Sequence, residues 1–385
     1  MDFILFLEAL CLGIVSGLIP GLHSNTVISI LSTFGIPAEE LGIMIVVIMA
    51  AHILTSFIPS IFFGIPESNT FISVLPGQRL VREGRGITAL KAVLFSGLFA
   101  ALLSIILFYP SLHIFPFLYS IIRPHLGYIL VILSAILLLR TKNPFLSLCV
   151  FLLSGILGYF SLNSDIYDPF LPLFSGMFAM GAILNYKKST IPEQKDEKLD
   201  LKFLKFSFLG VIGGMFADLL PGVSSPSQVA AFFTIFLPVN TLGYLASLSS
   251  ISISEAIFSF STQMSIEKSR IGATVWLSRF MPVEENILLV LVFFLLSVAA
   301  TTFIIVSLRK YIGKIAGFDF STMNVLIAAY LISIVFILDG ITGLGIFALG
   351  SVLGFFTIRM GIERTNLMGG VILPTILTLF KIFIL

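Results

Sequence analysis

The sequence predicts an all-α polytopic membrane protein built from two homologous, inverted repeats. Three observations predict this fold class. Only 11% of the 385 residues are charged and the mean hydropathy is +1.10, whereas a soluble domain carries about 25% charged residues. Many apolar stretches approach the roughly 20 residues that a helix needs to cross a bilayer. Three short sequence patterns also recur in the same order in both halves of the chain.

The apolar stretches define the expected helices in order. Six fall in the first half, near residues 3–19, 41–64, 88–110, 126–140, 144–161 and 168–185. Six fall in the second half, near residues 203–220, 240–262, 285–308, 322–339, 341–358 and 367–384. The longest charged segment, YKKSTIPEQKDEKLDLK, separates the two sets. We therefore predict a first transmembrane repeat at 1–185, a polar linker at 186–202 and a second transmembrane repeat at 203–385.

Three pairs of matching segments indicate the duplication. The segment LIPGLHSNT (18–26) matches LLPGVSSPS (219–227), EGRGITAL (83–90) matches KSRIGATV (268–275), and SGILGYF (154–160) matches GSVLGFF (350–356). The second pair places Arg85 opposite Arg270. Duplicated halves are a common transporter architecture: six crossing segments in each half would make the repeats parallel, and one re-entrant segment in each half would make them inverted.

Each half contains a Pro-Gly pair where an apolar segment would otherwise continue. Proline removes a helix hydrogen bond and glycine frees φ, so a helix ends there and can restart. Irregular backbone is tolerated at membrane depth only where protein or a water-lined cavity surrounds it. We therefore predict broken or re-entrant helices over 19–35 and 220–236, with an ordinary surface loop as the alternative.

These breaks carry the predicted binding site. A helix that begins at residue 22 or 223 directs unsatisfied N–H groups and the positive end of its dipole at the break, which suits a carboxylate or a phosphate. Helix capping is the alternative reading of the same polar side chains. The predicted substrate-binding residues are Pro20, Gly21, His23, Ser24, Asn25 and Thr26, then Ser68, Asn69 and Thr70 in a second polar break, and Pro221, Gly222, Ser224, Ser225, Ser227 and Gln228 in the second half.

Acidic and basic side chains complete the predicted site. Glu67, Asp218 and Glu255 lie in or beside apolar segments, where an ionisable side chain is costly and indicates function. We predict that they carry a coupling proton or help to hold a sodium ion; an interfacial position for Glu67 and a cap at Asp218 are the alternatives. Arg85 and Arg270 are predicted to gate entry or attract anions, or else to anchor the helices at the interface.

Composition and spacing exclude several other functions. The 22 basic and 20 acidic residues nearly balance, so no nucleic-acid partner is indicated. No second His or Cys lies near His23 in the sequence, so no metal site is predicted. No catalytic residue is predicted either. The expected cofactors are none, apart from Na⁺ or H⁺ as a coupling ion. His52 interrupts an apolar helix and is expected to hydrogen-bond a neighbour.

One segment resembles a known transporter family. SIFFGIPESNTFISVLPGQRLVREGRGITALKAVLFSGLFAALLS (60–104) resembles the large membrane subunit of tripartite tricarboxylate transporters, the TctA family, and GLIPGLHSNT (17–26) is similar to that family's early Pro-Gly-Leu-Gly motif. The first of these matches falls on Pro66, Thr70, Pro76, Gly77, Gly84 and Ala89-Leu90. The family's fourth motif residue, a glycine, is His23 here. The resemblance implies a multi-pass secondary transporter of a carboxylate in the cell membrane, with a small membrane subunit and a substrate-binding protein as partners.

Three further functions stay open at this point. ADLLPGVSSPS (217–227) resembles the Pro-Gly-Val-Ser motif of polyprenyl-phosphate translocases, which implies a lipid-carrier flippase. An intramembrane phosphatase and a structural partner subunit without its own substrate are the others. We predict a transporter rather than an enzyme, which works by alternating access on a small organic anion or a lipid phosphate within the lipid bilayer.

Overall fold

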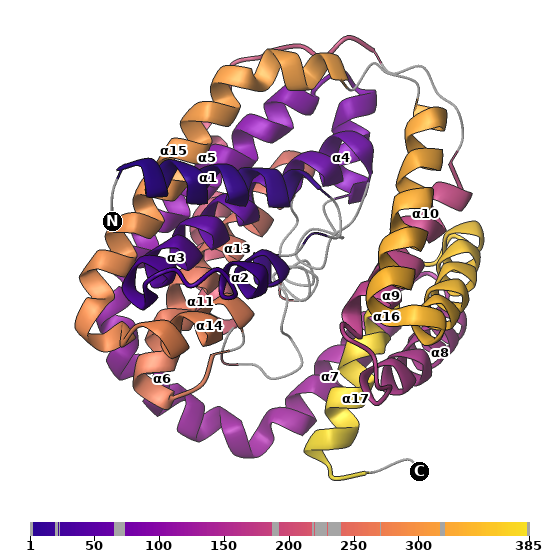
Figure 1. Ribbon diagram of the computed structural model, residues 1–385. Helices are drawn as coiled ribbons and strands as arrows, with labels where there is room; N and C mark the ends of the chain where they lie inside the picture. Colours follow the sequence, from indigo (N-terminus) through magenta and orange to yellow (C-terminus); the bar gives the residue numbers. More distant parts are fainter. Residues whose placement is uncertain are drawn as a thin grey trace.

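The computed structural model shows a chain of helices joined by turns (Figure 1). The residues that it describes are 3–19, 22, 24–64, 74–186, 192–217, 219, 229, 240–269, 271–315 and 320–382. In these residues there is no β-strand, and six helical runs are long and apolar enough to cross a membrane. The prediction of an all-α polytopic membrane protein is confirmed.

The helices follow the chain in two series. The first half contains α1 (Phe3–Leu18), α2 (Ser24–Leu31), α3 (Ala38–Thr55), the π-helical turn η1 (Pro59–Phe63), α4 (Val74–Arg82), α5 (Gly86–Ile106), α6 (Phe108–Ile122), η3 (Arg123–His125), α7 (Leu126–Leu139), α8 (Pro144–Leu162), α9 (Phe170–Phe174), η4 (Ser175–Met180) and α10 (Gly181–Leu184). The second half contains η5 (Leu201–Phe203), α11 (Leu204–Ala217), α13 (Thr241–Ile266), α14 (Gly272–Phe280), α15 (Val283–Ile315), α16 (Phe320–Arg359), η6 (Arg364–Met368) and α17 (Gly369–Leu379).

All twelve expected apolar segments contain helix, and the structure adds a helix between 110 and 126, a range outside the expected segments. The structure places α6 there, directly after α5. Pro110 lies in the first turn of α6, where a missing N–H costs no hydrogen bond, and the helix also accommodates Pro116 in its interior. Proline therefore marks a bend between two helices at Pro110 rather than the end of helical structure.

A sharp turn divides α16 at Gly340. Its φ of 63° and ψ of −153° are not helical, and glycine adopts such angles readily because it has no Cβ. The turn falls between the predicted helices 322–339 and 341–358, so that predicted boundary is confirmed. Next to the turn, the buried Asp339 accepts a hydrogen bond of 2.9 Å from the backbone N–H of Asp168 through Oδ1, which fixes the turn against the segment before α9.

The helices form two groups that lie side by side in Figure 1. The larger group contains α1 to α6 and α11 to α15, and the smaller contains α7 to α10, α16 and α17. In the smaller group, α8 packs against α17 and the second part of α16 packs against η4. The two groups are joined by the chain between α6 and α7, by the segment that leads from α10 to α11, and by the chain between α15 and α16.

Two helices, one from each half, lie at the centre of the larger group. Every residue from Leu41 to Thr55 of α3 is buried, and so is every residue from Leu245 to Thr262 of α13. The helices α1, α14 and α15 pack around α3, while α11, α5 and α6 pack around α13. Any polar side chain on the inner surfaces of α3 and α13 is therefore removed from lipid and is available for function.

Candidate functional site

Glycines bring a neighbouring helix very close to each central helix. A Cβ on Gly17 of α1 would lie 2.7 Å from the carbonyl oxygen of His52 on α3. A Cβ on Gly214 of α11 would lie 2.7 Å from the carbonyl oxygen of Ile251 on α13. Small residues permit this approach of helix backbones inside membranes. The pairs α1/α3 and α11/α13 thus share one packing arrangement, in which Ser56 and Glu255 occupy matching places.

The polar side chains on α3 make local hydrogen bonds. His52 is 1% exposed, and its Nδ1 lies 3.0 Å from Oγ of Ser16 on α1. The expectation that His52 hydrogen-bonds a neighbour is confirmed. Thr55 donates to the carbonyl of Ala51 at 2.9 Å, and Ser56 donates to the carbonyl of Ile53 at 3.0 Å. These bonds satisfy the polar groups within α3 and to α1, as a buried polar group requires.

The serines of α13 divide into two kinds. Ser249 donates to the carbonyl of Val93 on α5 at 2.7 Å, and Ser261 lies 2.6 Å from the hydroxyl of Ser111 on α6. By contrast, Ser252 and Ser254 donate to carbonyls of their own helix, at 3.0 and 2.6 Å. Serines of the first kind link α13 to neighbouring helices, and serines of the second kind satisfy their hydroxyl groups within α13. Most of the serine content of α13 is therefore explained by helix packing rather than by ligand binding.

Glu255 is the one predicted coupling residue that the structure describes. It is 1% exposed and lies in the middle of α13. The backbone N–H of Glu255 would be 2.9 Å from a Cβ on Gly214, so α11 covers this side of the helix. Its place within the larger group agrees with the predicted role in ion or proton coupling, which stays a prediction.

Two helix beginnings from opposite halves meet inside the larger group. The helix α2 begins at Ser24, which is 4% exposed, and the next side chain, Asn25, lies against Gly272, the first residue of α14. A Cβ on Gly272 would lie 2.9 Å from Cγ of Asn25. The N-cap residue of α14 makes no side-chain capping bond. The first turns of both helices, whose N–H groups carry the positive end of the helix dipole, therefore lie near the same contact, together with Thr26 in the first turn of α2.

Most of the predicted site residues lie outside the described residues. They are Pro20, Gly21, His23, Glu67, Ser68, Asn69, Thr70, Asp218, Pro221, Gly222, Ser224, Ser225, Ser227, Gln228 and Arg270. The predicted re-entrant segment at 220–236 lies there as well, apart from position 229, so the meeting of the two Pro-Gly breaks stays a prediction. Within the described residues, no three His, Cys, Asp or Glu side chains gather to hold a metal ion.

Arg85 lies at the end of the larger group where α5 begins, in contact with the polar segment that precedes α11. Its Nε is 3.0 Å from a carboxylate oxygen of Glu197, and both side chains are about two-fifths exposed (40% and 41%). The backbone N–H of Lys195 donates to the carbonyl of Gly84 at 2.8 Å, and the N–H of Gly86 donates to Oε1 of Gln194 at 2.8 Å. The described part of the linker, 192–200, thus binds the α4–α5 turn; we name these nine residues the strap.

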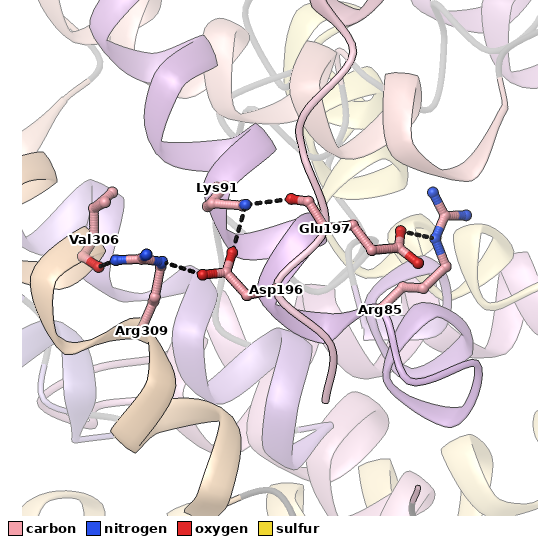
Figure 2. Close-up of polar contacts among 6 residues, drawn as sticks. All are labelled: Arg85, Lys91, Asp196, Glu197, Val306 and Arg309. Carbon is pink, nitrogen blue, oxygen red and sulfur yellow. Dashed lines mark hydrogen bonds and ion pairs between the residues drawn. The ribbon is translucent and has the colours of Figure 1, made fainter. Parts of the chain in front are cut away.

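Asp196 is the centre of the strap and was missed by the sequence analysis. Figure 2 shows its carboxylate between Lys91 of α5, at 2.6 Å, and Arg309 of α15, at 2.8 Å. The ammonium group of Lys91 also donates to the backbone carbonyl of Glu197. The hydrogen bond from Lys91, together with the charge of Arg309, lowers the pKa of Asp196 from its ordinary value. The sequence shows an acid in a polar linker but does not show which distant cations it meets.

Comparison with known proteins agrees with this architecture. The family model of the tripartite tricarboxylate transporter TctA family matches residues 3–369. The chain is 27% identical over 393 residues to the uncharacterized protein MJ1079 of Methanocaldococcus jannaschii, and the match covers 97% of each chain. No solved structure matches. The family is one of transporters, which excludes the intramembrane phosphatase. The multi-pass fold, the buried polar centre and the match along nearly the whole chain lead to one conclusion: the protein belongs to the tripartite tricarboxylate transporter TctA family.

Proposed function

We propose that this protein is a secondary transporter of a small organic anion, a carboxylate, which binds where α2 and α14 begin. The observation that carries the proposal is the contact between Asn25 and Gly272. It brings two helix N-termini, from opposite halves of the chain, to one place, where Ser24 is buried and Asn25, Thr26 and Gly272 are half-buried. The positive ends of the two helix dipoles and the neutral donors of Ser24, Asn25 and Thr26 favour an anion there. Neutral donors also let the anion leave, which transport requires.

The contacts of the smaller group support duplicated halves. A Cβ on Gly158 of α8 would overlap the carbonyl of Gly370, and one on Gly354 of α16 would overlap the carbonyl of Met177. A second pair of glycines on the partner helices repeats this agreement. A Cβ on Gly176 of η4 would meet the carbonyl of Phe347 in α16, and one on Gly369 of α17 would meet the carbonyl of Phe151 in α8. In each set, α8 of the first half corresponds to α16 of the second, and η4 corresponds to α17.

The direction of two corresponding helix runs supports an inverted arrangement. The sequence match pairs α5 and α6 with α14 and α15. At the strap, the beginning of α5 (Lys91) and the end of α15 (Arg309) meet at Asp196. Further along, Phe115 of α6 contacts Phe258 of α13, and Phe294 in the first part of α15 contacts Phe260. The two runs are therefore antiparallel, as inverted repeats in alternating-access transporters require.

Glu255 is the proposed coupling residue. It is a carboxylate in a fully buried helix, whereas the matching place on α3 holds Ser56, which cannot ionise. Protonation or sodium binding at Glu255 changes the charge of the membrane interior, which is expensive and therefore able to bias a conformational equilibrium. We propose that its occupancy couples the ion gradient to movement of the anion.

The binding proposal is tested by thermal stabilisation of the purified protein in detergent. A ligand that binds only the folded state raises the melting temperature by mass action. We expect stabilisation by citrate or a dicarboxylate, and an affinity at least about tenfold lower after Asn25→Ala, since a hydrogen bond to a charged group contributes about 1.5–3 kcal/mol. Thr33→Ala is the matched control, because Thr33 is exposed just after α2 and donates only to the carbonyl of Ile30.

The same assay includes a short polyprenyl phosphate. Stabilisation by this lipid and not by carboxylates would overturn the carboxylate proposal in favour of a lipid-carrier flippase. If no carboxylate and no lipid phosphate stabilises the protein at saturating concentration, the anion site at α2 and α14 is wrong. Dependence of citrate binding on an added small membrane subunit or substrate-binding protein would identify those partners, which the family implies but which are proposals for this chain.

A further inference from the structure

At the end of the larger group opposite the strap, the structure contains an open pocket that the transport proposal does not use. Its volume is about 570 Å³. It lies where α6 passes through η3 into α7, beside the end of α13, and this is one of the connections between the two helix groups (Figure 1). The pocket is lined by Pro116, Tyr119, Ser120, Arg123, Pro124 and Ile266.

Two cations gather around one ring at this pocket. The guanidinium carbon of Arg123 lies 6.0 Å from the centroid of the Tyr119 ring, and Nζ of Lys268 lies 5.2 Å from the same centroid. Lys268 also donates a hydrogen bond of 2.9 Å to the hydroxyl of Tyr119. In the part of the chain that the structure describes, neither cation forms an ion pair with an acidic side chain.

Two exposed cations at one ring form a positive site that favours an anion. Arg123 and Lys268 each follow the C-terminal end of a helix, α6 and α13, where the helix dipole favours a positive charge. That interaction and the aromatic ring stabilise each cation separately, but neither offsets the repulsion between two like charges held at one ring. A phosphate bound by both cations offsets their like charges, and the hydroxyl of Ser120, which donates to the carbonyl of Phe117 at 2.7 Å, lies at the rim.

The surroundings select a lipid rather than a soluble phosphate. The helix α6 belongs to a membrane-spanning run, and its large apolar side chains Phe117 and Ile121 are 66% and 52% exposed. Pro116, Pro124 and Ile266 give the pocket itself an apolar wall. An acyl chain that lies along α6 therefore reaches the pocket with its headgroup, and interfacial Lys and Arg side chains bind such headgroups at the ends of spanning helices. We propose that this pocket binds the phosphate of an anionic phospholipid.

The proposal is tested by native mass spectrometry of the full-length protein, with phosphatidylglycerol and phosphatidylcholine as competing probes. We expect preferential retention of phosphatidylglycerol. Because one basic residue near a membrane surface contributes about a fivefold preference for an anionic lipid, we expect Arg123→Gln and Lys268→Gln each to lower the preference by about fivefold and the double variant by about 25-fold. Arg279→Gln is the matched control, since Arg279 lies 4.9 Å from the Trp276 ring and no other cation of the described residues lies over that ring.

The possible results separate the alternatives. An unchanged preference in the double variant, or an equal loss in Arg279→Gln, overturns the proposal. Equal stabilisation of the protein by inorganic phosphate at millimolar concentration and by phosphatidylglycerol assigns the pocket to a soluble anion and also overturns it. If the double variant does not fold, Tyr119→Phe replaces it: this variant removes the hydroxyl that holds Lys268 but keeps the ring, and we expect about a twofold lower preference. Citrate binding at α2 is independent of every one of these results.

Discussion

The two central helices, α3 and α13, have the same packing but different chemistry. Both are fully buried over their central residues, and both are approached closely by glycines of a neighbouring helix. Yet α3 is apolar enough to be recognised as a membrane span, whereas α13 is not, because serines interrupt its apolar sequence. Because both helices are buried inside the protein and neither faces lipid over these residues, α13 tolerates polar side chains that a lipid-exposed helix would not.

The contrast also separates structural from functional polar residues. On α3, the imidazole of His52 is held by Ser16, and the other hydroxyls donate to backbone carbonyls. On α13, the hydroxyls of Ser252 and Ser254 likewise donate to backbone carbonyls. In addition, α13 has Glu255 at the position that Ser56 occupies beside α3. If the helices correspond by duplication, the carboxylate is a feature that one half has and the other lacks. The proposed coupling function is then carried by α13 alone.

The largest effect is expected from filling the close glycine contacts. We expect Gly17→Val and Gly214→Val each to lower the free energy of unfolding by about 3 kcal/mol, because the side chain has to displace the backbone of α3 or α13. The melting temperature and the yield of monodisperse protein in detergent measure this. Gly345→Val is the control, since nothing lies within 4 Å of a Cβ there. A large loss at one glycine and none at the other would break the proposed correspondence of the two helix pairs.

The next largest effect is expected at Glu255. We expect Glu255→Gln to lower gradient-driven uptake into proteoliposomes by at least about tenfold, because the amide cannot exchange a proton at physiological pH. Exchange of internal for external substrate, which needs no gradient, is retained. Ser56→Ala tests the matching place on α3 and leaves both activities near those of the natural protein. Gradient-driven uptake that persists in Glu255→Gln would remove α13 from the coupling mechanism.

Serine substitutions distinguish the two kinds of hydroxyl on α13. We expect Ser249→Ala to lower the free energy of unfolding by about 1 kcal/mol, since it removes a hydrogen bond between α13 and α5. Ser252→Ala is expected to change it by no more than about 0.5 kcal/mol, because its hydroxyl bonds only to its own helix. Melting temperatures of the two variants provide the comparison. Equal losses would show that the hydrogen bond from Ser249 to Val93 of α5 contributes no more to stability than the bond of Ser252 within α13.

The sequence predicted the helices well because their signal is local. Hydropathy identified the segments that became α3, α13 and both parts of α16, and it failed at α6, where Pro110 and Pro116 mark a bend and not an end. The candidate site was less predictable because it depends on contacts between distant residues. The sequence singled out Asn25 and Glu255, but it gave no sign that Asn25 meets Gly272 or that Asp196 joins Lys91 to Arg309.

The smallest effect is expected at the strap, which joins the neighbours of the two central helices, because α5 packs on α13 and α15 packs on α3. We expect Asp196→Asn to lower the free energy of unfolding by less than about 0.5 kcal/mol in low salt and by still less in high salt. The pKa of Asp196 is lowered in the folded protein. Its contribution is therefore fully present above the unfolded pKa of about 3.9 and is lost as the pH falls through the folded value.

Melting curves of Asp196→Asn and of the natural protein between pH 3 and pH 8 check this expectation. The difference between the two proteins should be constant from about pH 5 to pH 8 and should decrease as the pH falls below the unfolded pKa of about 3.9. Asp200→Asn is the matched control, since the carboxylate of Asp200, in the same strap, contacts only the neighbouring Lys202: it accepts from the backbone N–H at 3.0 Å and pairs with the exposed ammonium at 3.4 Å, so it joins no two helices of the larger group. If both substitutions have the same effect, the strap contributes only general surface charge and does not join α5 to α15.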